Sequence, residues 1–560
     1  MTSPTPPTLP QRETTDRLPW MLRAMAVIER AGNALPHPFW LFWILSGILA
    51  VISAILAAAS VSVVSPSDGE TVAVRNLLSG DGFAMAVSTM IENFATFPPM
   101  ATIVVVIMGV AVAERSGFLA AVMRVGVSRV PASWVVFAVA FAGTVAHVAS
   151  AAAYIILVPL GGLAFRAVGR SPILGIVVAY TSIASGYDAS PVPTPNDAIF
   201  AGITTAAAKI VGGEDAYVSP LSNWFFNIAS SVLLAAVITL VTKLVLSKRP
   251  DLDADPDAEL DDIGGLRLSD RERAALRRAT AALVVALAAL VIVMVPHGSP
   301  LRGEGGSIVE SPLLDGIAAV VAFLFGLVGI VYGRGTGVIG KAADVPRLMA
   351  EGIRQMAPVL VLFFAIAQFL AYFDWTRVGD VLAVRAAEAL EHSGLPLVAV
   401  FLMVLVLLTL VNIMVTSGSA MWALAAPVLV PMLMLVDVPA ETTQALFRIA
   451  DSGSTAITPM SPYFVMALGF LQRYRKNAGI GTLASYTLPL AIAMTAAWTL
   501  LFLAWWALGI PLGPGRSCRP ARPTPTASRR VATHRQGTGD ARAGTRRARQ
   551  PVPGKRAASR

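Results

Sequence analysis

Two charged residues, Arg448 and Asp451, interrupt an apolar part of the sequence, in the segment "ALFRIADSGSTAITPMSP". A charged side chain at the centre of a membrane span costs about 2.5–3.5 kcal/mol on insertion scales, so such residues are typically functional. Their i, i+3 spacing places them on one helix face, close enough to pair. We expect Arg448 to bind a substrate carboxylate as a bidentate fork, and Asp451 to orient it or to carry a cation or proton. The alternative is an ion pair that only anchors a hairpin.

The first half of the chain has ionisable residues around a proline-rich stretch, "ASGYDASPVPTPNDAIFAG". Asp197 follows three prolines, which suggests the buried start of a half-helix, and it is the better candidate for an ion-coupling acid. Asp188 precedes the prolines and is the second candidate. Either aspartate could instead cap the helix expected from Ala198. His147 lies in an apolar run, where it could relay a proton or serve as a hydrogen-bonded structural residue.

A group of small polar residues precedes an apolar run in the second half, "VNIMVTSGSAMWALAAP". The amide of Asn412 and the hydroxyls of Thr416, Ser417 and Ser419, together with free backbone carbonyls, would suit Na⁺ or a carboxylate at a helix N-terminus. Small residues at these positions could equally serve close helix packing. Trp422 would either fill the core or stack on a substrate ring.

Several familiar chemistries leave no trace in the sequence. It has no G-x-x-x-x-G-K-[ST] phosphate loop and no H-E-x-x-H zinc motif, and its five histidines are scattered. It has no G-x-S-x-G elbow either. We therefore expect a protein that is not an enzyme and that needs no cofactor or metal other than a coupling ion. An intramembrane enzyme, which would need a nucleophile beside a base, is the alternative from another class.

The composition predicts a membrane protein. Of 560 residues, 55% are hydrophobic and 14% are charged, whereas a soluble protein carries roughly 25% charged residues. The net charge of +9 comes from the tail, because 13 of the 43 Lys and Arg residues lie in 516–560 beside one acidic residue. The remainder has a small excess of acidic residues, so a nucleic-acid partner is not expected.

Apolar runs of about 20 residues, the length that crosses roughly 30 Å of hydrocarbon, recur along the chain. We expect an all-α polytopic protein with about nine transmembrane helices and two re-entrant helical hairpins. The expected spans are 39–60, 98–114, 132–149, 221–247, 276–296, 312–332, 355–373, the long tract 394–436, and 480–510.

The expected organisation is two transmembrane halves, 38–247 and 276–512, joined by a hydrophilic linker, 248–275. Lys and Arg in short loops place the N-terminal segment 1–37 and the linker in the cytoplasm. The segment 513–560 is expected to be a disordered basic tail. An odd number of spans would put this tail outside, against the preference of its arginines for the cytoplasm.

Each half contains a broken region, 149–202 and 411–462, in which Gly and Pro interrupt short apolar runs. Paired interruptions of this kind favour a secondary transporter with inverted repeats, because non-helical backbone at membrane depth is tolerated only where protein or water covers it. One constant shift along the chain, which we call the repeat offset, superimposes Tyr154 on Trp422, Pro159 on Pro427, Tyr180 on Arg448 and Pro191 on Pro459. Chance similarity between Ala- and Pro-rich segments is the alternative.

Over residues 25–510 the chain resembles the aminobenzoyl-glutamate transporter (AbgT) family. The resemblance rests on "IERAGNALPHPFWLF", "AGITTAAA", "SGSAMWALAAPVLVPM", "FRIADSGSTAITPMSPYF" and "RYRKNAGIGTLASYTLPL". It implies a dimer in a bacterial inner membrane, with nine spans and two re-entrant hairpins in each protomer. It also implies transport of p-aminobenzoyl-glutamate or export of sulfonamide-like antimetabolites, coupled to H⁺ or Na⁺. The family's binding residues would correspond to Asp197, Asn412, Ser419, Trp422, Arg448, Asp451 and Pro459.

The chain departs from the family in the first broken region. Where the family often has "SGGYSANLLIGTIDP", this sequence has "ASGYDASPVPTPNDA", with additional prolines and the additional acid Asp188. The proline that the family tends to have eight residues before the arginine is Ala440, next to Pro439. These departures leave open a di- or tricarboxylate cation symporter, and a passive channel is a further alternative.

Overall fold

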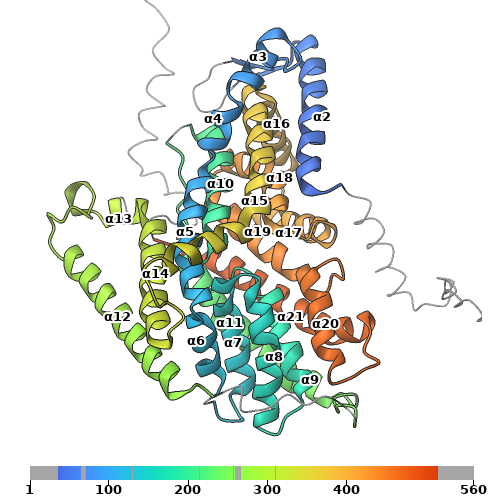
Figure 1. Cartoon of the computed structure of the whole chain (residues 1–560). Helices are drawn as coiled ribbons and strands as arrows, with labels where there is room; N and C mark the ends of the chain where they lie inside the picture. Colours follow the sequence, from blue (N-terminus) through green and yellow to red (C-terminus); the bar gives the residue numbers. More distant parts are fainter. Residues whose placement is uncertain are drawn as a thin grey trace, which may run out of the picture. The chain divides into compact units, whose positions relative to one another are not determined.

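The computed structural model describes residues 36–64, 71–128, 130–213, 215–256, 258, 267–308 and 311–514. In this part of the chain the only strands are β1 (Ser62–Val64) and β2 (Thr71–Ala73), which form a short antiparallel hairpin. All other elements are helices, which confirms the expected all-α class (Figure 1). The expected basic tail and most of the expected N-terminal segment lie outside the described residues.

Seven of the described helices are long and apolar enough to cross a membrane. Two further expected spans are shorter helices, α7 (Val135–Ala146), which continues into the 3-10 turn η2 (His147–Ala149), and α17 (Leu397–Met414). The expected long tract therefore divides after Met414 into α17 and a separate hairpin. The seven long helices are α2 (Pro38–Ala58), α5 (Pro98–Arg115), α11 (Trp224–Leu244), α12 (Asp270–Met294), α14 (Ile317–Thr336), α15 (Asp344–Trp375) and α21 (Ile480–Leu508).

Shorter helices connect and flank these spans. Two further 3-10 turns in the described part of the chain are η3 (Leu246–Lys248), after α11, and η5 (Glu304–Gly306), after α12. The remaining connecting helices are α3 (Gly80–Ser88), α4 (Met90–Ala95), α6 (Phe118–Ser128), α10 (Pro195–Gly212), α13 (Pro312–Asp315), α16 (Val378–Ser393) and α20 (Pro462–Gln472).

Two helical hairpins occupy the broken regions. The first is α8 (Ala152–Ala167) with α9 (Pro172–Ala184), and the second is α18 (Gly418–Met434) with α19 (Ala440–Thr455). A proline begins or precedes the second helix of each hairpin, where its fixed φ suits a helix start. The repeat offset carries α8 onto α18 and α9 onto α19, and the helix ends then nearly coincide. The repeat seen in the sequence is therefore a repeat of structure.

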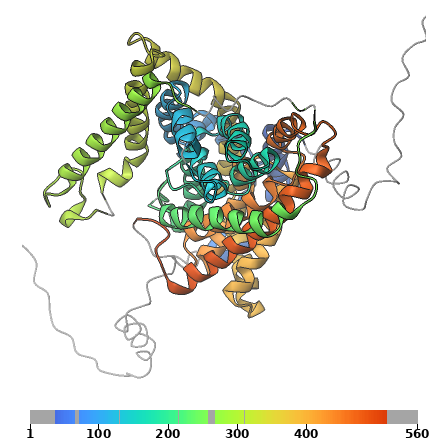
Figure 2. The same ribbon diagram turned by 90° about the horizontal axis from the view of Figure 1, so that it is seen from below.

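The two copies of the repeat are inverted. The repeat offset carries Ser230 of α11 onto Trp498 of α21, and these two residues contact each other, with Trp498 Nε1 donating to Ser230 Oγ at 2.7 Å. The backbone N–H of Phe226, near the start of α11, donates to the carbonyl of Leu512, just beyond the end of α21. Equivalent helices thus lie side by side and run antiparallel (Figure 2). Self-contact of equivalent residues is the mark of a two-fold relation.

Other helix pairs follow the same relation. Helix α14 packs along α5 as α15 packs along α2, and α16 packs on α18 as α6 packs on α8. In Figure 1, α8 and α9 lie in the lower part of the bundle, whereas α18 lies in its upper part. The two hairpins therefore enter the bundle from opposite ends, which brings their broken ends toward each other.

The start of the linker is fastened to the second half by ion pairs. Arg249 holds both carboxylate oxygens of Asp251, each at 3.0 Å, and Arg475 Nη1 lies 3.2 Å from Asp251 Oδ2. The Tyr486 hydroxyl donates to the Asp251 carbonyl. The hydrogen bonds from Arg249 hold the pKa of the Asp251 carboxyl well below its usual range. This cluster ties the end of α11 to the start of α21.

We predict that Asp251→Asn lowers the thermal stability of the detergent-solubilised protein at pH 7, because two arginines lose their shared anion. A carboxyl whose pKa is depressed in the folded state stabilises above its unfolded pKa, about 4, and loses that contribution as the pH falls through the folded value. The wild-type melting temperature should therefore fall more steeply on acidification below about pH 4 than that of Asp251→Asn. Asp253→Asn, at an exposed position nearby, is the control, and parallel wild-type and Asp251→Asn curves would contradict the role of the cluster.

Candidate functional site

The buried arginine of the second hairpin forms an ion pair with the first half of the chain. Arg448 lies in α19 with no exposed surface, and its Nη2 is 2.7 Å from Oδ1 of Asp197 at the start of α10. The alternative interpretation of the sequence was an ion pair with Asp451, one turn along the same helix. The ion pair found in the described structure is instead with Asp197 of α10.

Asp197 is held in place by the start of its helix. Thr194 is the N-cap of α10, and its backbone N–H and hydroxyl both donate to Asp197 Oδ2, at 2.7 and 2.8 Å. The Asp197 N–H in turn points to the Thr194 hydroxyl, which completes a capping box. One carboxylate oxygen therefore caps the helix while the other meets Arg448. The two sequence-based interpretations of Asp197, a helix cap and a site residue, are therefore compatible, because each uses a different oxygen of the carboxylate.

The remaining nitrogens of the Arg448 guanidinium also have partners. Nε donates to Oδ1 of Asn223 at 3.2 Å, and Nη1 donates to the backbone carbonyl of Asp188 at 3.4 Å. The Phe200 ring lies 5.5 Å below the guanidinium carbon. Asn223 is a site residue that sequence reasoning missed, since it is uncharged and lies in a loop before α11. The one feature of the sequence that marks Asn223 is an amide residue next to an apolar run, and this feature is too common to single out a residue.

One turn further along α19, Asp451 faces the break between α17 and α18. Residues 415–417 are not helical, and a Cβ built on Gly418 would lie only 2.6 Å from Asp451 Oδ2. The Asn412 amide donates to the Asp451 carbonyl and to the Ser454 hydroxyl. Neither Asp451 Oδ2 nor Asn412 Oδ1 has a hydrogen-bond partner among the described residues. Buried oxygens of this kind normally have a partner, so they point to a bound ion, water or ligand.

Asp188 follows the end of the first hairpin, and its carbonyl is the one that Arg448 contacts. Its backbone has φ +66°, in the left-handed region that aspartate tolerates better than most residues. Asn196 donates to Asp188 Oδ1 at 3.1 Å and to the Tyr187 hydroxyl at 2.6 Å, whereas Asp188 Oδ2 has no partner in the described part of the chain. His147 packs edge-on against the Tyr187 ring at 5.2 Å. The two ion-coupling candidates Asp188 and His147 thus share one neighbour.

The other expected binding residues are spread around this centre. Trp422 has no exposed surface, its Nε1 donates to Thr204 at 2.9 Å, and its ring stacks on Phe447 at 4.5 Å. Ser419 is half-buried in the first turn of α18, with its hydroxyl 3.5 Å from that of Ser417. Pro459 is half-buried between α19 and α20. Trp422 therefore fills the core between α18, α19 and α10.

A pocket of about 300 Å³ lies between α5 and α10, on the side of α10 that carries Ala198, the residue after Asp197. Thr96 and Thr102 border it on one side and Lys209 borders it at the end of α10. The pocket follows one face of α10 from Ala198 to Lys209, and neither residue of the ion pair lines it.

Comparison with known proteins gives concordant results. The sequence model described as the AbgT putative transporter family matches residues 23–519. The chain is 36% identical, over 490 residues, to the p-aminobenzoyl-glutamate transport protein of Escherichia coli (strain K12), covering 87% of this chain and 95% of that protein.

Two solved structures are similar over their whole length. The Alcanivorax borkumensis YdaH transporter, described as having an unusual topology, matches with a TM-score of 0.81 and 36% identity, and covers 86% of this chain. Neisseria gonorrhoeae MtrF, described with a class of antimetabolite efflux pumps, matches with a TM-score of 0.83 and 35% identity, and covers 88% of this chain.

We predict that Asp197→Asn destabilises the protein by about 3–5 kcal/mol, because it leaves the Arg448 charge buried without its counter-ion. The double variant Asp197→Asn with Arg448→Met should recover most of this loss, since it removes the uncompensated charge. Unfolding in mixed micelles of the wild type, both single variants and the double variant gives the coupling energy. Additive losses in this cycle would show that the two side chains do not depend on each other.

Proposed function

Because the chain belongs to the AbgT putative transporter family, we propose that it carries p-aminobenzoyl-glutamate, or a related folate-pathway or antimetabolite anion, coupled to a cation gradient. The observation that carries the proposal is Arg448, a fully buried cation between two re-entrant hairpins of an inverted repeat. Transporters with this architecture bind substrate where the repeats meet. The names of the relatives supply the substrate class, and the buried charge supplies the reason for an anion.

Arg448 retains capacity for a substrate carboxylate. Although Nη2 lies close to Asp197, it makes no hydrogen bond of good geometry in the described structure, so its protons are not fully used. The bond from Nη1 to the Asp188 carbonyl is long, at 3.4 Å. A substrate carboxylate could replace the long Nη1 contact and use the free capacity of Nη2, forming a bidentate pair that is shorter and roughly twice as strong as neutral hydrogen bonds. Asp197 would keep the guanidinium aligned while it waits for substrate.

The coupling cation is proposed to bind at Asp451. The unpaired side-chain oxygens of Asp451 and Asn412, the backbone carbonyls of Val415 and Thr416 and the hydroxyls of Ser417 and Ser419 are the hard oxygen ligands that Na⁺ takes, and a carboxylate can instead carry H⁺. Asp188 is a second acid that could carry a proton. Binding a cation beside Arg448 would offset the repulsion between the site's carboxylates and an anionic substrate.

The proposal includes the setting of the carrier. It would act as a homodimer in the inner membrane of a bacterium, with its N-terminus and linker in the cytoplasm. Basic residues flanking the linker, including Arg249 and Arg475 at one end of the bundle, support this orientation. A di- or tricarboxylate symporter is the second candidate, favoured only by the capacity of Arg448 for any carboxylate.

We predict that liposomes containing the protein accumulate p-aminobenzoyl-glutamate against its gradient when an H⁺ or Na⁺ gradient is imposed. Arg448→Ala should reduce this transport roughly thirtyfold or more, the equivalent of at least about 2 kcal/mol for a buried charged partner. Arg385→Ala, at an exposed surface pair, is the control and should transport normally. Competition by succinate or citrate as strong as that by unlabelled substrate would favour the second candidate, and flux that cannot run uphill would favour a channel.

We also predict that Gly418→Ala abolishes coupling, because the added Cβ would displace the Asp451 carboxylate from the break before α18. Transport should lose its dependence on the imposed ion gradient. Gly469→Ala, in α20 with open space around its Cβ position, is the matched control. Ion-dependent transport by Gly418→Ala at the wild-type level would rule out Asp451 as the coupling acid.

A further inference from the structure

The two copies of the repeat place different side chains at equivalent positions. The repeat offset pairs Arg448 with Tyr180 and Trp422 with Tyr154. The second hairpin therefore contributes a charge, whereas the first hairpin contributes two tyrosines. A site between such halves would fit a ligand with one anionic end and one aromatic end.

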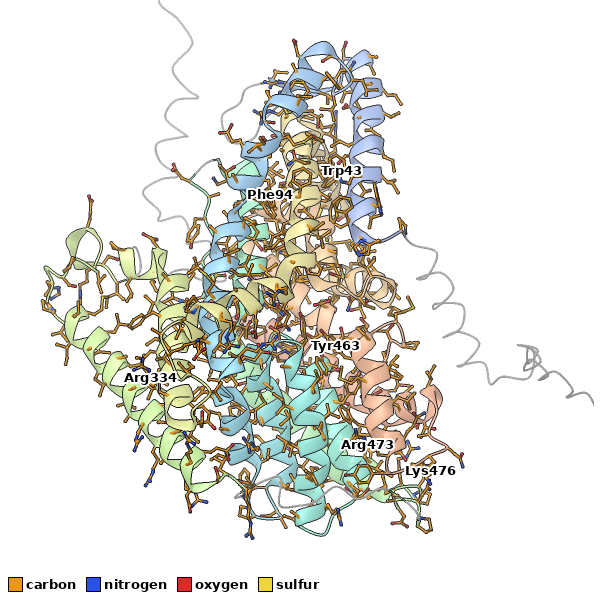
Figure 3. All side chains as sticks on the ribbon, viewed as in Figure 1. Trp43, Phe94, Arg334, Tyr463, Arg473 and Lys476 are labelled. Carbon is orange, nitrogen blue, oxygen red and sulfur yellow. The ribbon has the colours of Figure 1, made fainter. Side chains whose placement is uncertain are left out.

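The tyrosines of the first hairpin belong to a larger aromatic group. The Tyr154 ring stacks on Tyr463, the second residue of α20, at a centroid distance of 4.1 Å and an interplanar angle of 5°. Tyr180 packs against both Tyr154 and Phe464, at 6.1 Å in each case. Tyr463 lies near the middle of the described helices in Figure 3. The stack thus joins the first hairpin to the segment that follows Arg448 and Pro459.

This aromatic group does not have the chemistry of a simple core. Tyr154 is 3% exposed, and its hydroxyl has no hydrogen-bond partner among the described residues. A buried hydroxyl without a hydrogen-bond partner is destabilising, and phenylalanine would fill the same space without that cost. The hydroxyl also lies within electrostatic reach of Asp451 and Tyr187. The polar end of Tyr154 therefore points toward the candidate site.

Tyr463 differs from Trp422 in accessibility. One face of the Tyr463 ring is covered by Tyr154, but the residue as a whole is only half-buried. Trp422 has no exposed surface, and its ring and Nε1 are already engaged by Phe447 and Thr204. A substrate ring could extend the tyrosine stack without moving a core residue, whereas stacking on Trp422 would require separating it from Phe447.

We propose that Tyr463, backed by Tyr154, is the subsite that binds the aromatic ring of the substrate, while Trp422 is structural. This inference rests on the proposed function, because it assigns one end of an acyl-glutamate to Arg448 and the other to the stack of Tyr463 on Tyr154 from the first hairpin. The carboxylates face Arg448 of the second hairpin. The ring lies on the face of Tyr463 that Tyr154 does not cover.

The test measures the preference for a ring, as the ratio of affinities for p-aminobenzoyl-glutamate and N-acetylglutamate, by calorimetry on the detergent-solubilised full chain. Tyr463→Leu should weaken binding of the ring-bearing compound roughly two- to twelvefold, the range for an aromatic pair, and leave that of N-acetylglutamate unchanged. Tyr463→Phe should retain the wild-type ratio. Trp422→Phe should leave the ratio unchanged, whatever it does to both affinities. Phe225→Leu, an exposed ring on α11, is the control.

The outcomes separate the two proposals. If the wild type binds both compounds and Tyr463→Leu keeps its ratio, or if Trp422→Phe loses it, the ring subsite is overturned while the proposed function stands. If the wild type binds neither compound, the proposed function fails and the subsite with it. Should Tyr463→Leu not fold, Tyr463→Met, with an unbranched side chain that fills irregular space, must show the same loss of preference.

Discussion

The structure depends on one constraint, that the charge of Arg448 cannot stand alone inside a membrane protein. Removing an ion from water costs several kcal/mol, and only close partners offset that cost. The partners come from three separate places, Asp197 at the start of α10, Asn223 before α11 and the carbonyl of Asp188 after the first hairpin. Meeting this need brings the start of α10 and both broken regions to one point. The same need creates a cation at the centre of the bundle that an anionic substrate could use.

The inverted repeat explains how broken helices can meet there. Each hairpin enters from its own end of the bundle, and α11 crosses its equivalent α21 antiparallel, with Ser230 bonded to Trp498. Non-helical backbone occurs at 415–417 and near Ser150, with φ +46°. At membrane depth such backbone must be covered by protein or water. Architecture and chemistry are therefore linked, because the unpaired oxygens of Asp188 and Asn412 lie at or near helix ends and Asp451 faces the break between α17 and α18.

The differences between the repeats matter as much as their similarity. A two-fold arrangement with identical side chains would favour a symmetric ligand. In this chain the repeat offset instead pairs Arg448 with Tyr180. It also pairs the buried Trp422 with Tyr154, whose hydroxyl has no hydrogen-bond partner among the described residues. The rewritten segment that carries Asp188 adds an acid on one side only. In the proposed site, the positions at which the two copies of the repeat differ would set the preference for substrate.

The sequence by itself was sufficient for the fold class, the broken regions and the repeat. Lipid and backbone chemistry limit membrane spans to long apolar helices, and Gly and Pro mark their interruptions, so composition and spacing carry this information directly. The helix boundaries of both hairpins confirm the repeat offset.

Only the tertiary structure decided which residues contact Arg448. The i, i+3 spacing allowed Arg448 to pair with Asp451, but spacing tells which side chains share a helix face and not which distant element packs against that face. Asp197 and Asn223 reach Arg448 because α10 and the start of α11 lie against α19. Trp422 is buried because Phe447 and Thr204 cover it.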